Sequence, residues 1–158
     1  MRLGKGNELV KSLAVIILAA GKGTRMKSDL VKILHPIAGT PMLALTLDLA
    51  RSFRPDRLVV VVGSQRNLVR EQFGAEDLLF VDQEEQLGTG HAVLTAGPAL
   101  KDFQGTVLIL CADVPLLSEE TVKKFIKSLE EGLNTLTVLT TCLENPSGYG
   151  RVFRGEKG

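Results

Sequence analysis

The chain has 158 residues, of which 44% are hydrophobic and 23% charged, and its formal net charge is +1. These values are typical of a single globular domain and argue against disorder. The near-zero net charge excludes a global field for nucleic acid or an acidic membrane, so any anion site must be local. The two cysteines, Cys111 and Cys142, form no CxxC pair and are expected to be reduced, largely buried thiols of a cytoplasmic protein.

The start of the chain is short and polar. Residues 1–12 contain no apolar stretch that would suit a signal peptide, and they are expected to form a flexible extension ahead of a domain at 13–158. No apolar run reaches the about 18 residues that a membrane helix needs. We therefore expect a cytoplasmic protein with no membrane partner.

Strand patterns recur along the chain. Continuous apolar runs at 13–18, 58–62 and 107–110 are typical of parallel strands that are covered on both faces, and 78–81 is a shorter candidate. The alternating segment 135–140 predicts a last strand.

Helical signals lie between these strands. Thr40 is expected to cap a helix that begins at Pro41 and ends near Phe53. Shorter helices are predicted at 65–73 and 90–100. A further helix is expected after Ser118, with acidic residues in its first turn. Its apolar face consists of Val122, Phe125, Ile126 and Leu129.

This alternation of strands and helices predicts an α/β fold, a three-layer α/β/α sandwich around a Rossmann-like, mostly parallel sheet. In such sheets ligands bind beyond the carboxyl ends of the strands. The loop from Ala19 to Met26, which reads Ala-Ala-Gly-Lys-Gly-Thr-Arg-Met, occupies that position after the first strand.

The residue types in this loop suit a phosphate. Small residues let the backbone approach a ligand, and free N–H groups can hold phosphate oxygens. Lys22, Arg25 and Lys32 add positive charge, and Thr24 adds a hydroxyl. Neither the P-loop pattern nor the dinucleotide fingerprint fits, because the latter needs glycine where Met26 stands. Considered alone, a phosphate-binding loop and a plain glycine-rich turn remain about equally good interpretations.

Three later segments also carry candidate chemistry. The segment from Gln83 to Ala92 offers amides and glycines before a helix, which suits recognition of a base edge. A polar turn is the alternative, and it is the favoured interpretation for Gln86 and His91. Asp113 follows a buried strand, where one carboxylate could bind Mg²⁺, although a turn aspartate would look the same. Gly148 lies in a turn and is expected to need a positive φ.

The string from Leu18 to Met26, followed by Ser28-Asp29-Leu30, Lys32 and Leu34-His35, closely resembles the signature of sugar nucleotidyltransferases. The similarity is greatest to the uridylyltransferase domain of the bacterial bifunctional enzymes that also acetylate glucosamine-1-phosphate. It implies the nucleotide-diphospho-sugar transferase fold. It also implies catalytic roles for Arg25 and Lys32, which would contact phosphates and stabilise the charge that develops during transfer.

The resemblance assigns further roles, residue by residue. Gln83, Gly88 and Thr89 would contact the uracil, Asp113 would hold Mg²⁺, and Gly148 would touch the N-acetylglucosamine moiety. Two departures from the family pattern are Val31, where proline is usual, and Ala112, where glycine is more frequent. The nucleotide-binding set implied is Leu18, Ala19, Ala20, Gly21, Lys22, Gly23, Thr24, Gln83, Gly88, Thr89, Cys111, Ala112 and Asp113.

The implied reaction forms UDP-N-acetylglucosamine and pyrophosphate from UTP and N-acetylglucosamine-1-phosphate, for peptidoglycan and lipopolysaccharide precursors. The family's catalytic domain is longer than this chain. Residues 13–158 are therefore expected to be its N-terminal portion, without the second metal ligand or the acetyltransferase domain. The alternatives are a related transferase with another base or sugar, and a nucleotide-binding fragment without turnover. Neither a nucleic-acid partner nor a particular oligomeric state is predicted.

Overall fold

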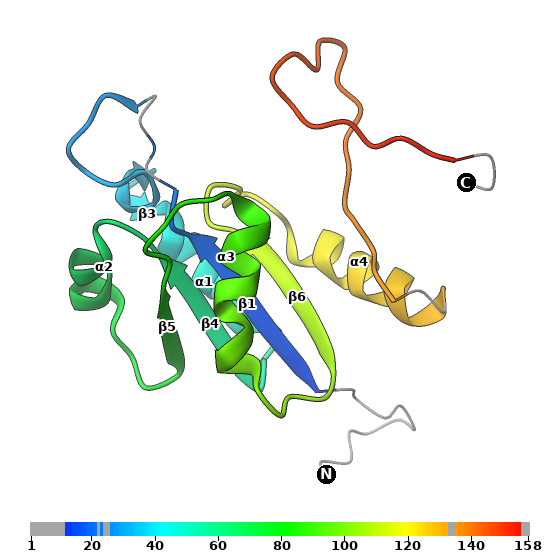
Figure 1. The fold of residues 1–158 in the computed structure, drawn as a ribbon, viewed down its shortest axis with the longest axis horizontal. Helices are drawn as coiled ribbons and strands as arrows, with labels where there is room; N and C mark the ends of the chain where they lie inside the picture. The colour runs from blue at the N-terminus through cyan, green and yellow to red at the C-terminus, as the bar shows by residue number, and fades with distance from the viewer. Residues whose placement is uncertain (1–11, 22, 24–25, 133–134, 156–158) are drawn as a thin grey trace. The chain divides into compact units, whose positions relative to one another are not determined.

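The structure is a computed structural model that describes residues 12–21, 23, 26–132 and 135–155. It contains two compact units, Met1–Glu119 and Glu120–Gly158. The first unit is built on a four-stranded parallel sheet with the order β5-β4-β1-β6 (Figure 1). The expected α/β fold with a mostly parallel sheet is confirmed. Its strands are β1 (Leu13–Ala19), β4 (Arg57–Val62), β5 (Leu78–Asp82) and β6 (Thr106–Cys111).

The apolar runs become the strands because both of their faces are covered. Ile17 of β1 pairs with Val60 on one side and with Leu110 on the other, and both Ile17 and Val60 are fully buried. Burial of such a side chain contributes about 1.5–3 kcal/mol relative to exposure. At the edge of the sheet this coverage ends, and β6 alternates between buried Leu108 and exposed Ile109.

Helices cover the two faces of the sheet. Figure 1 shows α3 (Thr89–Ala96) in front of the sheet and α1 (Met42–Ser52) behind it. α3 contributes Ala92 and Ala96 to a buried cluster with β1 and β4. The small alanine side chains let the helix lie close to the strands. α2 (Arg66–Phe73) connects β4 to β5. No helix among the described residues has the length and apolar character needed to span a bilayer.

The predicted start of α1 was wrong by one residue. Thr40 does not cap the helix; it lies in a short strand, β3 (Thr40–Pro41), which pairs with β2 (Pro36–Ile37). The turn between these strands needs two residues with positive φ, Ala38 at 48° and Gly39 at 86°. The predicted helix at 90–100 also divides, since α3 ends at Ala96 and a 3-10 turn, η3 (Gly97–Leu100), follows around a proline that has no N–H to donate.

The second unit contains all but the first residue of α4 (Glu119–Glu131), whose predicted apolar face is confirmed: Val122 is buried, and Phe125, Ile126 and Leu129 are half-buried. The strand predicted at 135–140 was wrong. This segment has no strand structure, and Leu136 and Val138 are 77% and 65% exposed. Alternation shows which side chains could share a face, but a strand also needs a neighbouring strand to bond its backbone groups.

Candidate functional site

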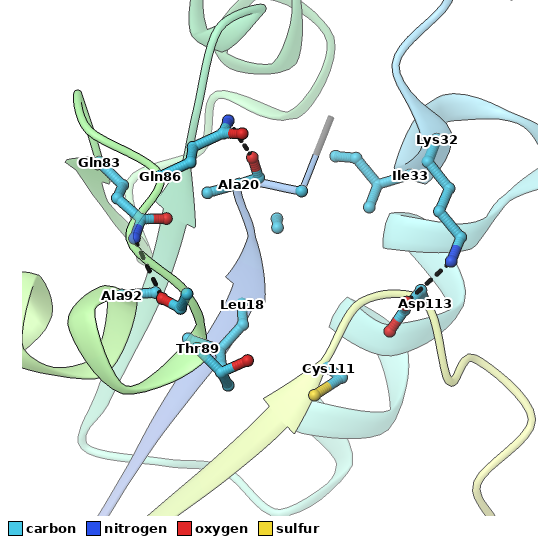
Figure 2. Close-up of a pocket in the computed structure, with 13 residues that line it drawn as sticks. Leu18, Ala20, Lys32, Ile33, Gln83, Gln86, Thr89, Ala92, Cys111 and Asp113 are labelled. Carbon is cyan, nitrogen blue, oxygen red and sulfur yellow. Dashed lines mark hydrogen bonds and ion pairs between the residues drawn. The ribbon is translucent and has the colours of Figure 1, made fainter. Parts of the chain in front are cut away.

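A cavity of about 320 Å³ opens beyond the carboxyl ends of β1, β5 and β6 (Figure 2). The chain order reverses at this point, because β4 lies on one side of β1 and β6 on the other. Such a switch point is where α/β sheets bind ligands, and the volume is in the range of small-molecule sites. The lining residues are Leu18, Ala19, Ala20, Gly21, Lys32, Ile33, Gln83, Gln86, Gly88, Thr89, Ala92, Cys111 and Asp113.

One wall is the beginning of the glycine-rich loop. The carbonyl of Ala20 accepts a hydrogen bond of 2.5 Å from Nε2 of Gln86, which crosses from the segment after β5 (Figure 2). Gly63 permits this contact, because a Cβ there would lie 2.6 Å from the Ala20 oxygen and 2.7 Å from Gln86 Nε2. Gln86, for which a plain polar turn was the favoured interpretation, therefore belongs to the cavity wall.

Further along the loop, Gly23 has a φ of +62°, and a Cβ at this position would lie 2.6 Å from Cβ of Lys32. The glycine thus brings the loop against the 3-10 turn η2 (Lys32–Leu34), although Gly23 itself is not among the lining residues. Lys22, Thr24 and Arg25, which sequence analysis placed at the phosphates, lie outside the described residues.

The two departures from the family pattern both have a local structural explanation. Val31 supplies an N–H, which proline lacks, and donates it to Oε1 of Gln65 over 3.0 Å. Gln65 in turn donates its Nε2 to the carbonyl of Asp29 at 2.6 Å, so one side chain holds both sides of this turn. Ala112 is fully buried and donates its N–H to Leu18, so its methyl group is accommodated in the interior.

Across the cavity from Gln83, the ammonium of Lys32 lies 2.8 Å from Oδ2 of Asp113 (Figure 2). Both side chains remain partly exposed, at 34% and 46%. No group of three side chains able to ligate a metal occurs within the described residues. A single carboxylate still fits Mg²⁺, which proteins often bind through one or two carboxylates together with substrate phosphates.

Cys111 lies beside this pair at the end of β6. It is a free thiol, as expected, but it is exposed, and so is Cys142; the prediction of largely buried thiols was wrong. Cys111 occupies the uncovered side of an edge strand, which explains its exposure. Partial desolvation, and then the negative charge of Asp113, raise the pKa of the Cys111 thiol.

The base-binding candidates form the far wall, where β5 leads into α3. Gln83 is 5% exposed, and its N–H donates to the carbonyl of Val62. Its side-chain nitrogen lies 3.3 Å from the carbonyl oxygen of Gly88 and 2.9 Å from Nδ1 of His91. Gly88 has a φ of +99°, a conformation that favours glycine, and Thr89 begins the helix beside it.

The structure thus places most of the predicted nucleotide-binding residues around one cavity. The lining residues that sequence analysis did not select are Ile33, Gln86 and Ala92. Ile33 and Ala92 contribute apolar wall, for which the sequence carries no signal beyond their nearness to Lys32 and Gly88. Gly148 belongs to the second unit; its φ of +81° confirms the expected turn conformation, and its contact with a sugar stays a prediction.

Comparison with known proteins agrees with this geometry. Residues 15–148 match the family described as the MobA-like NTP transferase domain. The bifunctional protein GlmU of Geobacter metallireducens is 58% identical over 147 residues, which cover 92% of this chain and 31% of that protein. The GlmU of Pelobacter propionicus is 55% identical, with 94% and 33% covered. The chain thus spans about a third of the length of these relatives.

Solved structures show the same fold at lower identity. The Mycobacterium tuberculosis protein Rv0371C, in complex with manganese, superposes with a TM-score of 0.62 at 23% identity, covering 74% of this chain and 59% of that one. A nucleotidyl transferase from Methanothermobacter has a TM-score of 0.62 at 21% identity, with 77% and 58% covered.

Proposed function

Since the chain belongs to the family of MobA-like NTP transferase domains, we propose that its cavity binds UTP for transfer of the uridylyl group to N-acetylglucosamine-1-phosphate. The products are UDP-N-acetylglucosamine, a precursor of the cell envelope, and pyrophosphate. The proposal draws its sugar specificity from the similarity to the GlmU proteins and concerns the activity of a protein of their length.

One observation carries the proposal: a single cavity at the switch point of the sheet gathers residues suited to each part of a nucleotide. Backbone at Gly21 suits phosphate oxygens, because no side chain stands between the peptide groups and a ligand. Lys32 and Asp113 provide a cation and a hard oxygen ligand at one edge. Gln83 provides a fixed amide for a base at the opposite wall.

The chemistry is an in-line displacement. A phosphate oxygen of the sugar phosphate bonds to the α-phosphorus of UTP, and the bond from that phosphorus to the bridging oxygen of the β-phosphate breaks, releasing pyrophosphate. The attacking phosphate is already ionised, so the reaction needs no general base. Lys32, and Arg25 by resemblance, hold positive charge where negative charge develops. Mg²⁺, which Asp113 would hold, supplies charge neutralisation and orientation of the phosphates when bound.

Binding and turnover should be tested separately. Titration calorimetry of the chain with Mg-UTP measures binding, and a pyrophosphate-release assay with N-acetylglucosamine-1-phosphate measures transfer. Asp113→Asn is expected to weaken binding of Mg-UTP by about tenfold or more, which is about 1.4 kcal/mol, since it removes the negative charge of the proposed metal ligand. Asp102→Asn is the matched control, because Asp102 precedes β6 and lies outside the cavity lining. A folded chain that binds no nucleoside triphosphate would refute the proposal.

Arg25→Ala tests the catalytic assignment in the longer protein. Removal of a preorganised charge typically lowers the rate by about 10²–10³-fold, while the fold should be retained. A screen of CTP, GTP and dTTP in the same assay distinguishes this function from that of a related transferase with another base. Wild-type turnover by the Arg25→Ala protein would overturn the role of this residue.

A further inference from the structure

The amide of Gln83 is held from two sides. Its nitrogen lies 3.3 Å from the carbonyl oxygen of Gly88 and 2.9 Å from Nδ1 of His91. The backbone of Gln83 is anchored as well, because its N–H donates to Val62 at the end of β4. The residue is almost completely buried, at 5% exposure, so the side chain has little room for another rotamer.

These contacts settle which way the amide faces. A carbonyl oxygen can only accept, so the atom nearest Gly88 must be the NH₂ group of Gln83. The second hydrogen of that group then points to His91, whose Nδ1 must offer a lone pair. A neutral His91 ring therefore carries its proton on Nε2. The remaining atom, Oε1 of Gln83, turns toward the cavity (Figure 2).

The orientation matters for the choice of base. Uracil presents a ring N–H at the position where cytosine presents an unprotonated ring nitrogen. A fixed acceptor can receive a hydrogen bond from the ring N–H of uracil. The ring nitrogen of cytosine offers it no hydrogen. A site that hydrogen-bonds one group rejects an analogue lacking it, because its buried polar atom stays unpaired.

We propose that His91 is a positioning residue that locks the Gln83 amide with its oxygen toward the cavity, and so selects a pyrimidine base with a ring N–H donor over cytosine. The inference rests on the proposed binding of a nucleoside triphosphate in this cavity. His91 acts through Gln83: it is the Gln83 oxygen that meets the base. His91 lies two residues after Thr89, in the first turn of α3.

A double-mutant cycle on binding tests this inference. Affinities of Mg-UTP and Mg-CTP are measured by calorimetry for the wild-type chain, His91→Phe, Gln83→Ala and the double variant. Wild type is expected to prefer UTP by about tenfold, the worth of one well-made hydrogen bond. His91→Phe should bring the ratio of the UTP affinity to the CTP affinity near one, mainly through weaker UTP binding. The double variant should be no worse than Gln83→Ala, because both changes remove the same interaction.

Two further variants separate positioning from a merely structural role. His91→Asn can offer its amide oxygen where Nδ1 stands and should restore much of the UTP preference. His35→Phe is the matched control, since the other histidine of the chain bonds the carbonyl of Leu30 and is absent from the cavity lining. Equal losses of UTP and CTP binding in His91→Phe, or additive losses in the cycle, would contradict the inference.

The tautomer of His91 gives a readout that needs no nucleotide. Nitrogen-15 spectra at mildly alkaline pH should show the proton on Nε2 of His91. A proton on Nδ1 would overturn the inference even if UTP binds. If the folded wild-type chain binds UTP and CTP equally, the selectivity fails while the proposed nucleotide site stands. If it binds neither, the proposed function fails and the inference fails with it.

Discussion

The ammonium of Lys32 lies 2.8 Å from the carboxylate of Asp113, although the two residues are 81 positions apart in the chain. Lys32 comes from η2 and Asp113 from the turn after β6. The two groups proposed for the phosphate and for the metal therefore form an ion pair with each other. A metal ion and Lys32 compete for one carboxylate, which means that ligation at Asp113 should free Lys32 for a phosphate.

We predict that Lys32→Met strengthens binding of Mn²⁺ to the chain without nucleotide. The pair is partly exposed, so its contribution is about 0–1 kcal/mol, and the gain in affinity should not exceed about fivefold. Titration of Mn²⁺ followed by electron paramagnetic resonance measures it, with Asp113→Asn expected to abolish the site. Binding of Mg-UTP should weaken in Lys32→Met. An unchanged Mn²⁺ affinity would show that the ion pair does not oppose the metal.

The bond between Val31 and Gln65 should replace the rigidity that proline supplies in the family. Val31 has a φ of −59°, which proline also adopts, so Val31→Pro fits the backbone but removes the N–H that Gln65 accepts. Proline reduces the conformational entropy of the unfolded chain, which stabilises the fold by about 0.4–1 kcal/mol. Loss of the hydrogen bond from Val31 to Gln65, which contributes about 0.5–1.5 kcal/mol, should offset this gain.

The measurement for this pair is the free energy of unfolding in urea. Gln65→Ala should cost less in the Val31→Pro background than in wild type, because one of the two bonds of Gln65 is already gone. An equal cost in both backgrounds would mean that the Val31 bond contributes nothing to stability.

Cys111 should report occupancy of the cavity. Its raised pKa reduces the thiolate fraction at neutral pH, so alkylation should be slower than for an ordinary exposed thiol and should rise at higher pH. Mg-UTP should slow the reaction further, because Cys111 lines the cavity. The measurement uses a Cys142→Ser chain and mass spectrometry. Asp113→Asn should speed alkylation, since it removes a charge that opposes the thiolate. A rate indifferent to saturating Mg-UTP would contradict the site.

Arg51 and Asp77 should make stability depend on acid pH. Two hydrogen bonds of 2.8 and 2.9 Å join them, and the bond from Arg51 is the main cause that lowers the pKa of Asp77. A carboxylate with a depressed folded pKa stabilises above its unfolded pKa, and this stability is lost as the pH falls toward the folded pKa.

Asp77→Asn should therefore lower the free energy of unfolding at neutral pH and make it less sensitive to acid. Because both side chains are exposed, at 39% and 51%, the difference should be about 0.2–1 kcal/mol. Urea midpoints at neutral and acid pH provide the test, with Asp102→Asn as the control. If the free energies of unfolding of wild type and Asp77→Asn change equally with pH, the Arg51–Asp77 pair does not contribute to the pH dependence of stability.

The sequence alone determined the central strands and the face of the last helix. The runs at 13–18 and 58–62 are apolar on both sides, and only a sheet covered on both faces can bury them; 107–110 also formed a strand, but at the sheet edge, where Val107 and Ile109 stay exposed. It failed at 135–140, because alternation of side chains does not supply a neighbouring strand. It missed the small β2–β3 hairpin, because the turn uses Ala38 in a conformation that alanine rarely adopts.

Only the tertiary structure decided how the site residues meet. The sequence selected Lys32, Gln83 and Asp113 by residue type and position after strands, but their partners depend on the strand order β5-β4-β1-β6. That order places Asp113 against Lys32 and sets the Gln83 amide between Gly88 and His91. Separation along the chain does not predict these distances, and a hydrogen bond has a direction only once both partners are placed in space.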